Sequence, residues 1–251
     1  MIKPDVASPW IVRKARPGAK LRLFCFPYSG GGSSAFRGWG DAMPSIDVCA
    51  VQAPGRETRM REPPFTAMEP LVAEIVQAIR PMLDQPFAFF GHSLGGFVAY
   101  ETARALRRAG APAPRHLFAS GCPSPHMHVV DAPIHGHPDA QLKDELRRYQ
   151  GTPDEVLKND ELMNLLLPLL RADFSIYETY RHEAEPPLDL PITALGGLED
   201  DDATREELDG WRAHTSKGFV LRMFPGNHFF VHTMRTRLLG TVLQDLAALL
   251  C

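Results

Sequence analysis

The sequence predicts an α/β fold in which one mostly parallel sheet carries helices on both faces. Short apolar runs alternate along the chain with segments whose apolar residues recur at helical spacing, a pattern typical of strand–helix–strand units. The run at 86–90 is apolar throughout, as expected of a strand buried on both faces. The 251 residues are 44% hydrophobic and 23% charged, which is ample for a core, and we expect a single domain over residues 1–251.

Each expected element rests on a run of this kind. After a polar start, residues 10–13 predict a short edge strand. Apolar runs predict further strands at 21–26, 46–52, 86–90, 115–121, 189–197 and 219–224. Helical spacing predicts helices at 36–43, 66–83, 94–109, 204–214 and 231–250, with Gly110 as the stop of the third.

A Gly-His-Ser-Leu-Gly segment at 91–95 joins the 86–90 strand to the next helix. A Ser on so tight a turn has a strained backbone, and its neighbours two positions away must lack side chains. The turn holds the Ser93 hydroxyl at a helix N-terminus, where backbone N–H groups can receive an oxyanion. This is the nucleophile elbow of the α/β-hydrolases, and it predicts Ser93 as a catalytic nucleophile. A glycine-rich turn that only packs is the alternative.

The strand–helix alternation stops between residues 123 and 187, where only helical patterns occur, at 139–149 and 161–180. The second has more apolar positions than one buried stripe needs, so part of it is expected to face substrate. α/β-Hydrolases place a lid in such an insertion, and we expect this one to be a lid after the sixth strand. Its Pro-rich ends, at 123–125 and 186–187, predict that it gates access to the site. Additional core helix is the alternative.

A glycine-rich segment, Pro-Tyr-Ser-Gly-Gly-Gly-Ser-Ser, follows the 21–26 strand. In an elbow-type site one oxyanion donor is the N–H of the residue after the nucleophile, here Leu94, and the second comes from this early loop, where we expect Ser29. The glycines let the backbone approach the reacting carbonyl closely. Phosphate binding is the weaker interpretation, because no Lys follows the glycines and dinucleotide-binding spacing is absent.

The base and acid of a catalytic triad are expected after later strands, at the same edge of the sheet as Ser93. His228 follows the 219–224 strand and is favoured among ten histidines by position alone. It would accept the Ser93 proton while a carboxylate holds the imidazole tautomer. Four consecutive acids at 199–202 follow the 189–197 strand, and the pattern alone does not choose among them.

The loop at 54–64 places Arg56, Arg59 and Arg61 within six residues, after the carboxyl end of a strand. Ligands of open parallel sheets bind at that edge, so these arginines, together with Tyr28 of the early loop, are expected to contact substrate or its carrier. A solvated surface loop is the alternative, and Arg56 is equally suited to holding the loop in shape.

Composition and charge exclude several other classes. A net charge of -3 argues against a nucleic-acid partner, and no apolar run is long enough to span a membrane. Four scattered cysteines indicate buried free thiols in a cytoplasmic protein. We expect no metal or other cofactor. Two His-x-His pairs are candidate metal ligands, His126 with His128 and His135 with His137, but the only acids near them are Asp131 and Asp139.

Motifs over nearly the whole chain resemble the type II thioesterases, the stand-alone editing hydrolases of polyketide and nonribosomal peptide synthesis. They are F-C-F-P-Y-S-G-G-G, A-P-G-R-E-T-R-M-R-E-P-P, G-H-S-L-G-G-F-V-A-Y-E, D-F-S-I-Y-E-T-Y, G-G-L-E-D and P-G-N-H-F-F. The second and the last are much more specific than the elbow. Gly197-x-x-Asp200 matches the family's acid, so the resemblance implies Asp200. Members often have Pro after this Asp, whereas Asp201 stands here, which keeps Asp201 open.

The resemblance implies hydrolysis of acyl thioesters from the phosphopantetheine arm of acyl or peptidyl carrier domains. The arm belongs to the substrate, so no cofactor of the enzyme's own is implied. Because a Met lies about twenty residues before the first confident strand, we expect a separate protein that acts in trans. A general carboxylesterase or acyl-CoA thioesterase is the runner-up. A non-catalytic binding protein would be expected to lose Ser93, Asp200 or His228, and all three are present.

Overall fold

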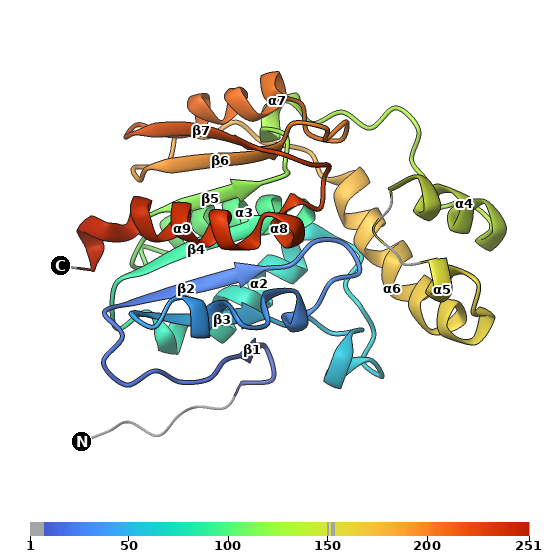
Figure 1. Ribbon diagram of the computed structural model, residues 1–251, viewed down its shortest axis with the longest axis horizontal. Helices are drawn as coiled ribbons and strands as arrows, with labels where there is room; N and C mark the ends of the chain where they lie inside the picture. The colour runs from blue at the N-terminus through green and yellow to red at the C-terminus, as the bar shows by residue number, and fades with distance from the viewer. Residues whose placement is uncertain (1–7, 150, 152–153, 251) are drawn as a thin grey trace.

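The computed structural model describes residues 8–149, 151 and 154–250. Its sheet has seven strands in the order β1-β3-β2-β4-β5-β6-β7 (Figure 1). All neighbouring strands run parallel except β1, which pairs antiparallel with β3. Their bounds are β1 Ile11–Val12, β2 Leu21–Phe26, β3 Ile46–Val51, β4 Phe87–His92, β5 Leu117–Ser120, β6 Ile192–Gly197 and β7 Phe219–Phe224. Every predicted strand is confirmed, as is the mostly parallel sheet with helices on both faces.

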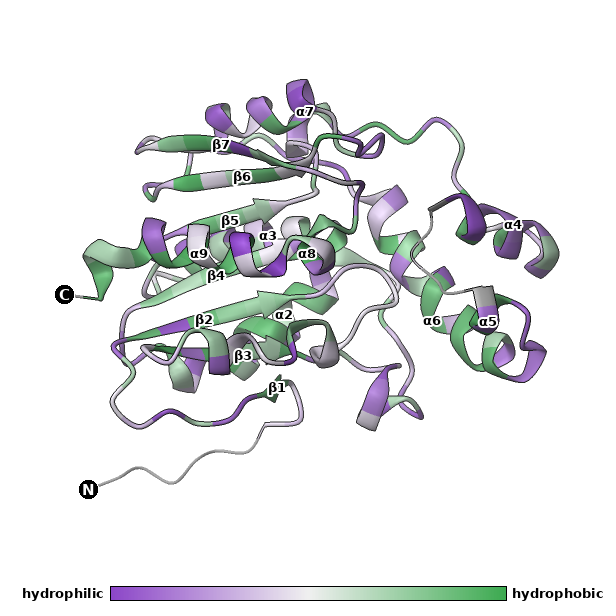
Figure 2. Cartoon of the chain, in the orientation of Figure 1, coloured by the Kyte–Doolittle hydropathy of each residue, from purple (hydrophilic) through white to green (hydrophobic). Residues whose placement is uncertain are grey.

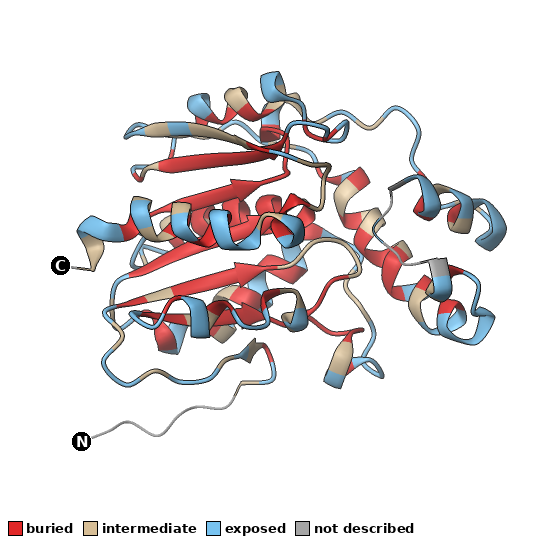
Figure 3. Ribbon diagram, viewed as in Figure 1, coloured by how far each residue is buried: buried red, intermediate tan, exposed pale blue. Residues whose placement is uncertain are grey.

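Side chains alternate across the sheet and build a core on each face. Phe89 packs with α2 (Met68–Ile79) and α3 (Leu94–Arg108). Its neighbour Phe90 packs with α1 (Trp39–Ala42) and α9 (Arg235–Leu246) on the opposite face. The central strands are therefore hydrophobic (Figure 2) and buried (Figure 3) along their length.

Four predicted helices are shorter or broken in the structure, since 36–43 and 66–83 shrink to α1 and α2 and two others divide. The 204–214 helix is α7 (Arg205–Asp209) followed by a 3₁₀ turn, and it begins in a capping box between Thr204 and Glu207. The 231–250 helix divides at Met234 into α8 (Phe230–Thr233) and α9, because the Met234 backbone leaves helical geometry. Gly110, with φ of 60°, ends α3 as predicted.

The helical insertion forms a separate layer beyond the carboxyl ends of the strands (Figure 1). It contains α4 (Asp139–Tyr149), α5 (Asp154–Leu157) and α6 (Asp160–Thr179), which share a small apolar core that includes Leu142, Leu157 and Met163. The insertion follows β5, the fifth strand, so the prediction of a lid after the sixth strand is off by one. The reason is that the described part of the chain has a single strand, β1, before β2.

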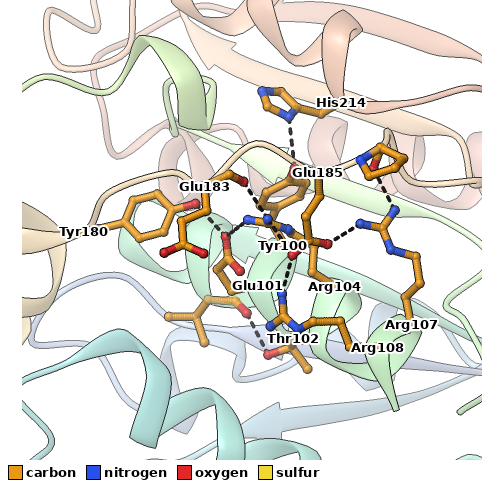
Figure 4. A network of polar contacts seen from close by, with 12 residues as sticks. Tyr100, Glu101, Thr102, Arg104, Arg107, Arg108, Tyr180, Glu183, Glu185 and His214 are labelled. Atoms are coloured by element: carbon orange, nitrogen blue, oxygen red, sulfur yellow. Dashed lines mark hydrogen bonds and ion pairs between the residues drawn. The ribbon is translucent and has the colours of Figure 1, made fainter. Parts of the chain in front are cut away.

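The chain that returns from α6 is fixed to α3 by buried polar contacts (Figure 4). Tyr180 Oη donates to Glu101 at 2.7 Å, and Arg104, which is 2% exposed, bonds both Glu101 and the Glu183 carbonyl. Burial raises the pKa of Glu185, but hydrogen bonds from three arginines outweigh it and lower the pKa to about 2. The carboxyl end of α6 is therefore held to the core.

Three of the four cysteines, Cys25, Cys49 and Cys122, are buried free thiols as predicted, and Cys251 lies outside the described residues. None of the helices in residues 8–149 and 154–250 has the length and apolar character needed to cross a lipid bilayer.

Candidate active site

Ser93 occupies the turn between β4 and α3 with a strained backbone, at φ 54° and ψ −124°. A Cβ added at Gly91 would lie 2.0 Å from the Gly95 carbonyl oxygen, and one added at Gly95 would lie 2.1 Å from that of Phe26. Side chains at either position would therefore clash with backbone. The strain and the glycine requirement expected of a nucleophile elbow are both confirmed.

Asp200 and His228 form a hydrogen-bonded pair. His228 Nδ1 lies 2.9 Å from Asp200 Oδ2 and 3.1 Å from Oδ1. Because an ionised carboxylate only accepts, Nδ1 carries the proton and Nε2 is left as an acceptor. Asp200 is 7% exposed, and the Asp202 backbone N–H donates to its Oδ1 at 3.0 Å. Asp201 is exposed. Of the four consecutive acids, the structure thus pairs Asp200 with His228.

A cavity of about 350 Å³ brings the separated residues together. Ser93 and His228 both line it, with Tyr28 and Ser29 of the early loop. Leu94 is the first residue of α3, where backbone N–H groups have no partner within the helix. The Ser93 N–H is already bonded to the Ser120 carbonyl at 2.8 Å, so Leu94 is the next amide available at the elbow. Donor roles for Ser29 and Leu94 stay predictions.

The lid helix α6 contributes one wall of this cavity. Leu170, Phe174 and Tyr177 line it, whereas Met163 and Leu167 pack into the core of the insertion. Leu162 and Leu165 are exposed. The apolar side chains of α6 therefore face the cavity, the core of the insertion and solvent. Those that face the cavity agree with the expectation that part of this helix faces substrate.

Aromatic and imidazole rings surround the elbow, and sequence reasoning missed one of them. Tyr28 Oη lies 3.0 Å from His232 Nε2 of α8, and its ring packs edge-on against Phe229. Burial raises the pKa of Tyr28, so its hydroxyl stays protonated. The sequence places His232 only within the predicted 231–250 helix, since nothing in a sequence links residues 204 positions apart.

His92, next to the nucleophile, is fully buried with its Nδ1 2.9 Å from Ser120 Oγ. Its ring centroid lies 5.0 Å from that of His228. Burial, with a smaller effect of His228, holds the pKa of His92 well below its usual range. A neutral His92 therefore packs beside His228.

Two of the three arginines expected to contact a carrier are buried within the fold. Arg56, 7% exposed, forms an ion pair with Asp173 at 2.9 Å. Arg59, 8% exposed, bonds Glu62 and the Gln52 carbonyl and lies over the Trp10 ring. Their guanidinium groups stabilise the 54–64 loop, so the contact prediction is wrong for both. The reason is that acceptors within the fold take up both charges, the buried Asp173 for Arg56, and the Glu62 carboxylate with the Gln52 carbonyl for Arg59. Only Arg61 is exposed.

The histidines of the two His-x-His pairs have partners in different places. His126 Nδ1 lies 2.8 Å from His214 Nε2, while His128 Nε2 lies 2.8 Å from the Tyr177 carbonyl oxygen. His135 bonds the Glu178 carboxylate. These contacts give His126, His128 and His135 separate structural partners, whereas Nδ1 of His137 is buried without a hydrogen-bond partner among the described residues.

Comparison with known proteins agrees with this geometry. The thioesterase domain family matches residues 21–246. The gramicidin S biosynthesis protein GrsT of Aneurinibacillus migulanus is 41% identical over 97% of this chain and 96% of that protein. RedJ, a thioesterase from the prodiginine pathway of Streptomyces coelicolor, is 41% identical, with a TM-score of 0.86 over 95% of both chains.

YbtT, a type II thioesterase of the yersiniabactin pathway, is 31% identical and has a TM-score of 0.87 over 96% of this chain and 100% of that one. Both family and fold are thereby shown over almost the whole length described. The chain belongs to the thioesterase family and is a hydrolase of thioesters built on the α/β-hydrolase fold.

Proposed function

We propose that this thioesterase removes acyl groups from the phosphopantetheine thioesters of carrier proteins, as a stand-alone editing enzyme of polyketide or nonribosomal peptide synthesis. One observation carries the chemistry: Ser93 and His228 line the same cavity, and Asp200 fixes His228. The pathway is supported by the relatives, since YbtT is named for a nonribosomal peptide and polyketide pathway, and GrsT and RedJ for the biosynthesis of gramicidin S and of prodiginine.

In the acylation step His228 Nε2 accepts the proton of Ser93 as its Oγ attacks the thioester carbonyl carbon. The carbonyl electrons move to the oxygen, where the N–H groups of Leu94 and Ser29 are the proposed donors. When the intermediate collapses, the C–S bond breaks and His228 gives its proton to the departing thiolate. An acyl ester on Ser93 remains.

Deacylation repeats these steps with water as the nucleophile. His228 accepts a proton from water, the hydroxide attacks the acyl ester, and the proton returns to Ser93 as the free acid leaves. Asp200 keeps the Nδ1 proton in place throughout. This chemistry is proposed to need no metal or cofactor, because the phosphopantetheine comes with the substrate.

The triad chemistry does not by itself select thioesters from carriers. A thiol of pKa about 8.5 is a good leaving group, so any Ser hydrolase of this fold is expected to cleave simple thioesters. Selectivity must come from recognition of the arm and of the carrier. Exposed Arg61 remains the candidate contact for an acidic carrier surface. Buried free thiols agree with a reducing compartment, and we propose the cytoplasm.

A comparison of three substrates with one acyl group tests this function: the acyl carrier protein, the acyl N-acetylcysteamine thioester and the ethyl ester. We expect the highest kcat/KM for the carrier, with a preference that shrinks as salt is added. Equal kcat/KM for the carrier and the small thioester would favour an acyl-CoA thioesterase. Preference for the ethyl ester would favour a general carboxylesterase, and no turnover of any of them would favour a binding protein.

A further inference from the structure

Three segments that are distant in sequence meet at the buried carboxylate of Asp173. This residue lies in α6 and is 1% exposed. Its Oδ1 accepts from Arg56 Nη2 at 2.9 Å, and its Oδ2 accepts from Arg56 Nη1 at 3.2 Å. The same Oδ2 accepts from the backbone N–H of Gly30 at 2.7 Å. The lid helix, the 54–64 loop and the early glycine-rich loop are thus joined at one charge pair.

The two bonds to the glycine-rich loop are made at the two residues that directly follow Ser29, the residue expected to donate to the oxyanion. The Gly30 N–H belongs to the Ser29–Gly30 peptide, and Arg56 Nη1 also donates to the Gly31 carbonyl oxygen at 2.8 Å. α6 touches the loop as well, since a Cβ at Gly30 would lie 2.6 Å from Leu170 Cδ2. The backbone around Ser29 is therefore held by Asp173, Arg56 and close packing of the lid helix.

The far end of the same loop is held by the residue next to Arg56. Glu57 accepts from Ser33 Oγ and, at 2.9 Å, from the Ser34 N–H. Burial raises the pKa of Glu57, but the hydrogen bonds from Ser33 and Ser34 outweigh it and lower the pKa. Glu57 also has a positive φ of 48°. Such strain persists only where the surroundings enforce it, as these bonds do.

Stability alone does not account for a buried ion pair at this position. Taking two charges out of water offsets most of their attraction, and apolar replacements of such pairs are often as stable. An apolar pair, however, offers no acceptor for the Gly30 N–H and no donor for the Gly31 carbonyl. Only polar groups can fix those two peptides in one orientation.

We propose that Asp173 and Arg56 are positioning residues for the oxyanion site. They fix the Ser29–Gly30 peptide and the Gly31 carbonyl, and the Gly31 N–H in turn holds the carbonyl of the Tyr28–Ser29 peptide, which carries the Ser29 N–H, at 2.8 Å. They also make the oxyanion geometry depend on α6 being docked against the loop. The inference rests on the proposed function, in which Ser29 donates to the carbonyl oxygen. Removing one oxyanion donor lowers kcat by roughly 10²–10³. A misplaced donor is expected to approach that loss without a comparable change in KM, because the charge forms only in the transition state.

Variants Asp173→Leu, Arg56→Met and the double Arg56→Met/Asp173→Leu test the proposal. Arg59→Met is the matched control, because Arg59 is equally buried on the same loop but bonds Glu62 and Gln52. The substrate is an acyl N-acetylcysteamine thioester, and active enzyme is counted by end-point titration with a fluorophosphonate. A trifluoromethyl ketone bearing the same acyl chain reports the oxyanion site, because its adduct with Ser93 carries the negative oxygen.

We expect both single variants to lose about a hundredfold in kcat per active site, with KM within about twofold of wild type. The Ki of the ketone should rise by a similar factor. Arg59→Met should lower Tm and leave kcat per active site unchanged. The double variant should regain Tm, because no charge is left unpaired, and should remain slow.

A double variant that regains both Tm and kcat would overturn the proposal, as would folded single variants with wild-type kcat and ketone affinity. Either result would leave Asp173 and Arg56 with a purely structural role. Failure of the proposed function is distinguishable, since it would show in the wild type as missing thioester turnover or as no preference for a carrier.

Discussion

Asp200 Oδ2 lies 2.9 Å from His228 Nδ1, whereas Asp201, the next residue along the chain, is exposed. The Asp202 N–H fixes the other oxygen of Asp200. One carboxylate of a run of acids is therefore selected by the turn after β6. This pairing gives the first prediction.

Asp200→Asn is expected to lower kcat by about 10⁴, because an amide does not hold the His228 tautomer that leaves Nε2 free to accept a proton. Asp201→Asn, the matched neighbour, should stay within a few-fold of wild type, since its side chain is exposed. Steady-state kinetics on a small acyl thioester measure both. A crippled Asp201→Asn beside an active Asp200→Asn would mean that the turn carries a different acid to His228.

Arg61→Glu should lower kcat/KM for an acidic acyl carrier and spare the small acyl thioester. Exposed charges act mainly on encounter, so the loss should shrink with added salt. Arg59→Glu should instead lower Tm and affect both substrates alike, because it places a carboxylate beside Glu62 and the Gln52 carbonyl. A carrier reaction unaffected by Arg61→Glu would remove this arginine from the docking surface.

The lid is expected to move less than its Pro-rich ends suggest. α6 is joined to the core through Arg56, through Tyr180 and through a 3.2 Å hydrogen bond from Ser175 Oγ to the Thr66 carbonyl oxygen. A Thr66→Cys/Ser175→Cys disulfide should therefore leave turnover of the carrier substrate within about twofold of its reduced form. If the disulfide suppresses turnover and reduction restores it, α6 must move during catalysis, as the sequence predicts for a gating lid.

Folding stability should fall as the pH drops from about 6.5 to 4. Burial lowers the pKa of His116 from 6.5 to about 4, so in this window the unfolded chain binds a proton that the folded protein does not. The contribution of His116 to the free energy of unfolding is fully present above pH 6.5. It declines by at most about 3 kcal/mol as the pH falls to 4. His214, with a pKa lowered to about 3 chiefly by burial, adds a decline of the same sign.

His116→Phe provides the measurement for this linkage. The phenyl ring can stack on Phe118 as His116 does, and Thr193 keeps its 2.9 Å bond to Asp245. Urea unfolding between pH 7 and 4.5 should show a shallower pH dependence in the variant, by up to one proton. Identical slopes for variant and wild type would mean that His116 titrates normally in the folded protein.

Local chemistry explains what the sequence predicts well. The strands are short apolar runs, and the elbow is a strand–turn–helix unit whose glycines are required by contacts within it and to β2. Ser93 and His228 follow from their places at strand ends. Asp200 needed the structure to separate it from Asp201, because a shift of one residue in a turn decides which side chain points inward.

What the sequence could not predict depends on partners far away in the chain. Arg56 and Asp173 are 117 residues apart, so the sequence does not reveal their ion pair. Without knowledge of Asp173, the three arginines of the loop predict a docking surface. The contact between Tyr28 and His232 likewise joins residues that are far apart in the sequence. Burial, and not residue type, decides whether an arginine meets solvent or supports a loop.

The central claim is that Ser93 attacks a carrier-bound acyl thioester. Intact-protein mass spectrometry of an acyl-loaded carrier, incubated with wild type or Ser93→Ala, tests it most directly. Wild type should remove the acyl mass and leave the phosphopantetheine arm, while Ser93→Ala should be slower by about 10⁴ to 10⁶. Deacylation of the carrier by Ser93→Ala at a rate close to wild type would contradict the account.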